Sequence, residues 1–202
     1  MRNQQGQGLL ETIVALGIIV SGVVGMLNLT ITNQTATGDS SERLVATNLG
    51  REGVEVVRNI RDTNWLSCGI VAGTLSCSNW DAGLVSGSDT TAVPLFNPAT
   101  NVWTIDFTPE DVAHNYARVW RYTSGVAGNI GTQFQASDAA PADATETPYR
   151  RLLTLSSICG DKTVAASCSG TKIGIRVQST VEWTARGRAN SLTVEERLFN
   201  WR

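Results

Sequence analysis

The sequence has a single histidine, His114. A Ser/His/Asp or Cys/His catalytic arrangement would have to use it, and nothing in the stretch HNYARVW marks a nucleophile. The glycine-rich stretch at 125–131, GVAGNIG, lacks the Lys-Ser/Thr ending of a phosphate-binding loop. Calcium-loop spacing is also missing, although Asp138, Asp143 and Glu146 could hold an ion weakly in one loop. We therefore expect no enzyme, no cofactor and no dedicated metal site.

Basic residues are missing from one long stretch of the chain. Residues 63–112 contain five acids and no Lys or Arg, whereas residues 113–202 contain eleven bases and seven acids. A basic C-terminal half could attract DNA or an anionic surface, although such a bias is more often a solvated face. The net charge of −2 and the 42% hydrophobic content are ordinary for a globular protein, and 202 residues allow one domain with an appendage.

Charge is almost absent from residues 9–29, where Glu11 is the only ionisable side chain. As a helix these residues would be about 31 Å long, which is enough to cross the hydrocarbon core of a membrane. Arg2 and the initiator amine lie before this run, so the positive-inside rule predicts a cytoplasmic N-terminus. A cleaved secretory signal is the alternative, but the run is long for one and no clear small-x-small site follows it.

Glu11 needs compensation in such a segment. A charged side chain at the centre of a membrane helix costs about 2.5 to 3.5 kcal/mol, and less near the interface. If the chain were cut between Gly6 and Gln7, the new α-amino group would lie four residues before Glu11, near it on a helix or available to the Glu11 of a neighbouring copy. The residues therefore favour a processed N-terminus.

The stretch GQGLLE at 6–11, after a short polar leader with one Arg and before an apolar run, resembles the signal of type IV pilins and pseudopilins. The resemblance implies that a prepilin peptidase cuts after Gly6 and methylates Gln7. It also implies that Glu11 helps to register subunits in a filament. The residue after the cut is commonly Phe in this family and is Gln7 here.

Cysteine occurs only four times, as two pairs that each enclose eight residues: CGIVAGTLSC and CGDKTVAASC. Because each pair is close in sequence and encloses turn-forming residues, we expect Cys68 to pair with Cys77 and Cys159 with Cys168. In the chain-entropy model each ring would stabilise the fold by about 2.7 kcal/mol. The spacings are too wide for zinc knuckles, and disulfides indicate an extracytoplasmic setting.

Helical spacing resumes after a polar stretch at 30–43, with apolar residues at Leu44, Val45, Leu49, Val54, Val57 and Ile60. We expect one long helix over about 9–64, with a bend or break at Gly38 and a new N-cap at Asp39 or Ser40. The glycines Gly17, Gly22 and Gly25 would either allow the membrane half to melt partly or permit close helix packing.

Short strands are expected beyond Trp65, at residues 101–107, 116–122, 149–158, 172–185 and 190–202. The last three would form an antiparallel meander packed on the helix, with Ile173, Ile175, Val177, Val181 and Trp183 on its buried face. Residues 125–148 are expected to be an exposed loop within a large irregular region at 86–148. Five tryptophans, at 65, 103, 120, 183 and 201, are expected in the core or between helix and sheet.

The expected fold is therefore α+β and pilin-like, with a long N-terminal helix on a C-terminal antiparallel sheet. Its parts are a leader (1–6), a membrane and assembly helix (7–29), an amphipathic helix (30–64) and a β-rich domain (65–202). The resemblance implies a minor pilin or pseudopilin whose partners are prepilin peptidase, other pilin subunits and the cytoplasmic membrane. The alternatives are a DNA- or surface-binding pilin and an uncleaved, single-span anchored domain.

Overall fold

A computed structural model describes residues 5–71, 74–87, 90–97, 100, 102–124, 131–137, 141 and 143–200, with the side chains of 5–7 and 70–76 left out. The expected positions Asp138 and Trp201, residues 1–4 of the leader and residues 125–130 of the glycine-rich stretch lie outside this description. The chain divides into two compact units, Met1–Arg43 and Leu44–Arg202.

Helix α1 extends over Gln5–Leu66 without interruption, so the expected break at Gly38 is wrong. No proline occurs before Pro94, and the ladder of backbone hydrogen bonds can therefore continue through the polar stretch. The hydroxyls of this stretch donate to carbonyls four residues earlier instead of capping a new helix, as Ser40 Oγ does to Ala36 O at 2.8 Å. A glycine inside a helix lowers helix stability by only about 1 kcal/mol relative to alanine, so the single Gly38 does not end a helix of this length.

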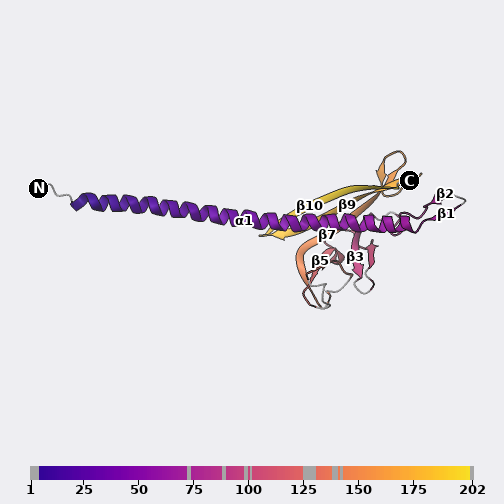
Figure 1. The fold of residues 1–202 in the computed structure, drawn as a ribbon, viewed down its shortest axis with the longest axis horizontal. Coiled ribbons are helices and arrows are strands. Elements are labelled where there is room, and N and C mark those ends of the chain that lie inside the picture. Colours follow the sequence, from indigo (N-terminus) through magenta and orange to yellow (C-terminus); the bar gives the residue numbers. More distant parts are fainter. Residues whose placement is uncertain are drawn as a thin grey trace. The chain divides into compact units, whose positions relative to one another are not determined.

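The second unit contains an eight-stranded antiparallel sheet in which the long path runs β10-β9-β7-β3-β4 (Figure 1). The bounds on this path are β3 Thr91–Asn97, β4 Val102–Asp106, β7 Ala144–Cys159, β9 Lys172–Ala185 and β10 Arg188–Phe199. Three further strands join β7 directly or through a neighbour: β5 Arg118–Tyr122, β6 Gln133–Phe134 and β8 Val164–Ala165. A separate hairpin pairs β1 Gly69–Val71 with β2 Thr74–Ser76, and a 3-10 helix, η1 Asn115–Ala117, precedes β5.

The meander expected from the sequence is present, because β9 pairs with β7 on one side and with β10 on the other, antiparallel in both cases. The expectation for the preceding region is wrong in part. Strands β4 and β5 coincide with the strands expected at 101–107 and 116–122, but β3 and β6 lie in parts of 86–148 that were expected to be irregular, and β7 begins at Ala144. Phe134 and Gln135 are buried within what was expected to be an exposed loop.

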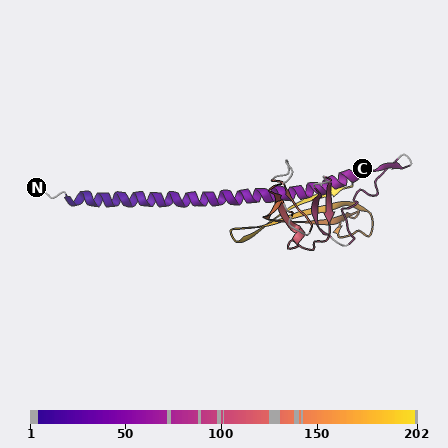
Figure 2. The same ribbon diagram turned by 90° about the horizontal axis from the view of Figure 1, so that it is seen from below.

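The core of the second unit lies between the sheet and residues 44–66 of α1 (Figure 2). One cluster joins Val54 and Val57 of the helix to Ile175, Val177, Leu153, Leu155 and Leu198 of the sheet, and a second surrounds Ala46 and Leu49. Trp120 and Trp183 are buried as expected, and Trp65 packs at the edge of the first cluster. Trp80 is also in that cluster and is 4% exposed, although its position in a turn gave no periodic signal.

Candidate functional site: an exposed apolar helix segment

The N-terminal part of α1 has no covering layer within its own unit. Its large apolar side chains are between 50% and 71% exposed: Leu9, Leu10, Ile13, Val14, Leu16, Ile18, Ile19, Val20, Val23, Val24, Met26, Leu27, Leu29 and Ile31. Soluble proteins rarely leave a continuous apolar surface of this length open to water. Among the described residues, α1 is the one helix long and apolar enough to cross a membrane.

Glu11 lies on this segment as an exposed carboxylate and is the only ionisable side chain between Gly8 and Gly38. Gly6 and Gln7 are part of α1 as well, one turn before Glu11. The helix therefore brings the backbone of the expected cleavage position and Glu11 within about one turn, or 5.4 Å, along one axis.

The hydroxyl groups of the segment are satisfied inside the helix. Thr12 Oγ1 donates to Gly8 O at 2.7 Å, Ser21 Oγ to Gly17 O at 2.8 Å and Thr30 Oγ1 to Met26 O at 2.9 Å. A hydroxyl that already donates to the backbone can enter hydrocarbon at lower cost than a free one. Glu11 is thus the one charged side chain of this surface, and an external partner has to compensate its charge.

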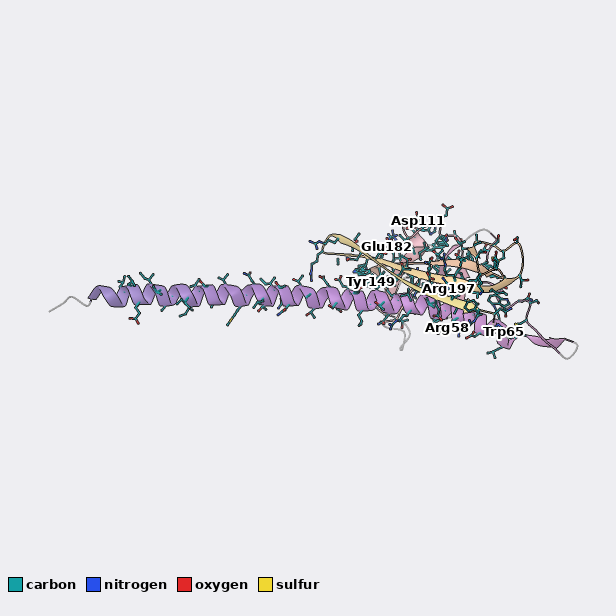
Figure 3. The ribbon with its side chains drawn as sticks, turned by 90° about the horizontal axis from the view of Figure 1, so that it is seen from above. Arg58, Trp65, Asp111, Tyr149, Glu182 and Arg197 are labelled. Atoms are coloured by element: carbon teal, nitrogen blue, oxygen red, sulfur yellow. A yellow bond between two sulfur atoms is a disulfide. The ribbon has the colours of Figure 1, made fainter. Side chains whose placement is uncertain are left out.

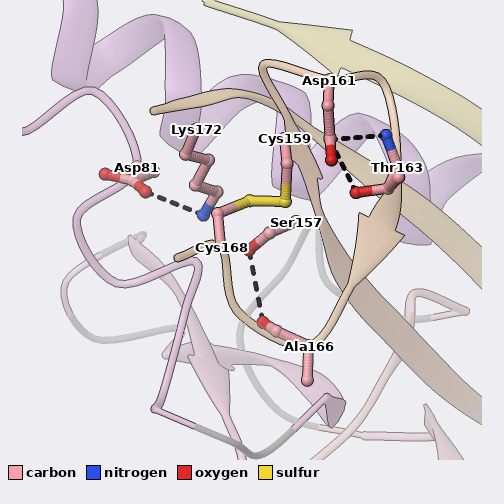
Figure 4. Close-up of a disulfide and its surroundings, with 8 residues drawn as sticks. All are labelled: Asp81, Ser157, Cys159, Asp161, Thr163, Ala166, Cys168 and Lys172. Atoms are coloured by element: carbon pink, nitrogen blue, oxygen red, sulfur yellow. Dashed lines mark hydrogen bonds and ion pairs between the residues drawn. A yellow bond between two sulfur atoms is a disulfide. The ribbon is translucent and has the colours of Figure 1, made fainter. Parts of the chain in front are cut away.

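Both disulfides join the expected pairs, Cys68–Cys77 and Cys159–Cys168. The second ring is fixed at several points (Figure 4). Asp161 accepts hydrogen bonds from the Thr163 hydroxyl at 2.7 Å and the Thr163 amide at 3.0 Å, and these bonds hold the pKa of the Asp161 carboxyl below its ordinary value. Ser157 Oγ of β7 donates to Ala166 O of the ring at 3.3 Å, and β8 within the ring pairs with β7. The ring is therefore part of the ordered domain.

The domain also contains a buried polar group that sequence reasoning missed. Arg151 of β7 is fully buried, and its guanidinium donates to Gln135 Oε1 at 2.7 Å, to Glu52 Oε2 at 2.7 Å and to the Leu49 carbonyl at 3.0 Å. Burial lowers the pKa of Arg151, while the Glu52 charge acts in the opposite direction. Gln135 completes the group by donating to the carbonyls of Tyr116 and Arg151. These contacts fasten residues 49–52 of α1 to the sheet.

Asp143 and Glu146, which were considered for weak ion binding, each contact a different residue in the structure. Asp143 accepts from the Ser124 hydroxyl at 2.9 Å, and Glu146 pairs with Arg118 at 3.2 Å. Within the described ranges, no group of three or more His, Cys, Asp or Glu side chains is arranged to hold a metal ion. His114 has a local structural contact, because its Nδ1 accepts from the Tyr116 amide at 3.3 Å at the start of η1.

Several bases of the C-terminal half are used to hold the domain together. Arg118 pairs with Glu146 and Lys172 with Asp81, while Arg150 donates to the Ala113 carbonyl at 2.8 Å. Arg151 is buried. The composition of residues 113–202 therefore overstates the positive charge that a nucleic acid could reach.

No protein-family model, curated protein or solved structure matches this chain. The evidence for the α+β arrangement and for the membrane-length helix therefore comes from the structure alone. In that structure the sheet packs on residues 44–66 of α1.

Proposed function

We propose that this protein is a structural subunit, a minor pilin or pseudopilin, of a type IV pilus or a related secretion filament. Prepilin peptidase would cleave it after Gly6, and the mature chain would begin at Gln7. Before assembly it would be held in the cytoplasmic membrane by the apolar part of α1, with its N-terminus in the cytoplasm. After assembly the same surface would be covered by other pilin subunits.

One observation carries the proposal: an exposed apolar helix segment has its single carboxylate, Glu11, one turn after the Gly6–Gln7 bond. Cleavage there creates an amine that can neutralise a carboxylate in a medium of low dielectric constant, where an ion pair is much stronger than in water. An amine from one copy and Glu11 from the next would also fix the axial position of the two helices. An anchor used only for attachment needs no charge at this position.

The proposal is tested by the intact mass and N-terminal residue of the protein from its native envelope, in membrane and sheared surface fractions. We expect a chain that begins at Gln7, with or without an added methyl group, in the sheared fraction. Gly6→Ala should prevent the shortening, whereas the matched Gly8→Ala, after the bond, should leave it unchanged. A full-length chain confined to the membrane would identify an uncleaved single-span anchored domain and would contradict the proposal.

A role in binding DNA or a surface ligand would be added to this function and would not replace it. Retention of DNA by the protein should then fall steeply with salt, because released counterions drive such binding. The internal contacts of Arg118, Arg150, Arg151 and Lys172 make this the weaker proposal.

A further inference from the structure

Cleavage after Gly6 would make a glutamine, Gln7, the first residue of the chain. An N-terminal glutamine can react with itself. The electron pair of its α-amino nitrogen attacks the carbon of its own side-chain amide, and the new C–N bond closes a five-membered lactam, pyroglutamate. The bond from that carbon to the amide nitrogen breaks, one amine proton passes to the departing nitrogen, and ammonia leaves. The reaction needs no oxidant, reductant or second residue, because every atom of the ring belongs to Gln7.

The surroundings of Gln7 in α1 leave room for this ring. Gly8 follows it directly, and a Cβ atom added at Gly8 would lie in open space. The large apolar side chains beyond Gly8 are at least half exposed, and Figure 3 shows side chains standing free along this part of α1. Among the described residues of the unit Met1–Arg43, none packs over the apolar segment. A subunit outside an assembly therefore has no internal layer that would protect its new N-terminus.

Glu11 is the nearest group that could keep the amine from reacting, as the only ionisable side chain between Gly8 and Gly38. An amine paired with a carboxylate stays protonated, and an ammonium has no electron pair with which to attack an amide. Within one subunit such a pair is weak, because it lies at the water-facing end of the span. Its orientation is also the less favourable one, with the cation before the anion on a helix. The amine of a lone subunit is therefore free for much of the time.

Assembly would change the surroundings of the same amine. Between packed apolar helices it would lie beside the Glu11 of a neighbouring copy, in a medium of low dielectric constant where an ion pair is much stronger than in water. The packed helices would also exclude the water with which the ammonium exchanges its proton. The nitrogen would then remain protonated, and the ring could not close.

We infer that Gln7 is a self-modifying residue. In mature subunits that remain outside a filament, its α-amine closes onto its own amide to give pyroglutamate, and assembly prevents this reaction. The inference rests on the proposed function for the cleavage after Gly6. The lactam nitrogen carries no charge, so a closed subunit has nothing to pair with the Glu11 of a neighbour and is excluded from assembly. Closure also removes a positive charge from the start of α1, where the helix dipole disfavours one. Gln7 thus limits the time during which a processed subunit can enter a filament.

The test follows the full-length protein in its native envelope after a short isotope pulse. Intact mass is measured during the chase in the membrane and sheared surface fractions. Closure lowers the mass of the mature chain by one ammonia, whether or not a methyl group has been added. We expect the closed share of labelled chains to rise with time in the membrane fraction and to stay several-fold lower in the sheared fraction. Fragmentation of the intact chain should place the loss at residue 7.

Gln7→Met is the matched control, because methionine has a similar length and no amide. Labelled chains of this variant should keep their full mass in both fractions. Late in the chase, a several-fold larger share of them than of wild-type chains should still pass from the membrane fraction to the sheared fraction. Equal late entry of the two proteins would show that closure does not exclude a subunit and would overturn the inference.

The masses also separate failure of this inference from failure of the proposed function. Mature chains that begin at Gln7 and keep their ammonia throughout the chase would overturn the inference and leave the filament subunit in place. A closed share that is equal in the two fractions, or a loss of ammonia that persists in Gln7→Met, would overturn it as well. Chains that keep residues 1–6 in every fraction would contradict the proposed function and this inference together.

Discussion

Gly53 of α1 lies so close to Ser179 of β9 that a Cβ atom on Gly53 would be 2.7 Å from the Ser179 hydroxyl oxygen. The same atom would be 2.9 Å from Leu153 Cδ2, and both neighbours are fully buried. The absence of a side chain at Gly53 therefore sets how closely the helix approaches the sheet. Ser179 interrupts the apolar alternation of β9 at the point where that approach leaves no room for a larger side chain.

Gly53→Ala should destabilise the domain, although alanine is the better helix former by about 1 kcal/mol. Overpacking of a close contact costs about 1–3 kcal/mol, so we expect a net loss of about 1–2 kcal/mol. Tryptophan fluorescence during thermal unfolding of the full chain in detergent would measure it, because Trp80, Trp120 and Trp183 are buried. Gly160→Ala is the control, since its nearest neighbour would be 3.5 Å away. Equal melting temperatures for both variants would contradict the close approach.

Glu52→Ala should cost more than an ordinary surface substitution, because it leaves the buried guanidinium of Arg151 without its anion. Breaking a buried pair costs about 3–5 kcal/mol, and we expect the lower end because the Glu52 side chain is 37% exposed. In an Arg151→Met background the same substitution should cost much less. Glu55→Ala is the control, since the pair of Glu55 with Arg58 is exposed and such pairs contribute about 0–1 kcal/mol. The free energies of unfolding would be measured in urea. If the losses from Glu52→Ala and Arg151→Met simply add in the double variant, Glu52 does not compensate the charge of Arg151.

Stability should depend on Asp161 at acidic pH. Hydrogen bonds from Thr163 lower the pKa of Asp161 below its ordinary value of 3.8, so the folded state favours the ionised carboxylate. This stabilisation is fully present above the ordinary pKa and is lost as the pH falls through the lower, folded value. The difference in melting temperature between the wild type and Asp161→Asn should therefore be constant near neutral pH and should shrink below about pH 4. A difference that stays constant down to pH 2 would contradict the assignment.

The sequence predicts the longest and most regular elements best. The expected strand at 172–185 coincides with β9, because Ile173, Ile175 and Val177 alternate with polar residues. Strand β3 was missed because it contains Pro94, which removes a backbone donor. Strands β1, β2, β6 and β8 have two or three residues each, too few for a periodic signal. Their positions depend on contacts with distant parts of the chain.

The alternation of residues in β7 implies that Arg151 is buried, although we did not predict this from the sequence. Tyr149, Leu153 and Leu155 are apolar at alternate positions, and Arg151 occupies the same face of β7. Period-two alternation therefore places an arginine on the buried face, which requires an internal partner. The identity of that partner could not be predicted, because Glu52 and Gln135 are separated from Arg151 by 99 and 16 residues.

Glu11→Gln should separate membrane insertion from assembly. The substitution keeps the size of the side chain and removes the charge, so the apolar segment should insert at least as well and cleavage after Gly6 should continue. Without a carboxylate to pair with the amine of a neighbouring Gln7, the amount of processed protein in the sheared fraction should fall at least tenfold, while the membrane fraction keeps it. Glu11→Asp, which retains the charge on a shorter side chain, should restore part of the assembly. Normal filaments from Glu11→Gln would show that the carboxylate serves neither registration nor charge pairing, and the exposed apolar surface alone would then have to drive assembly.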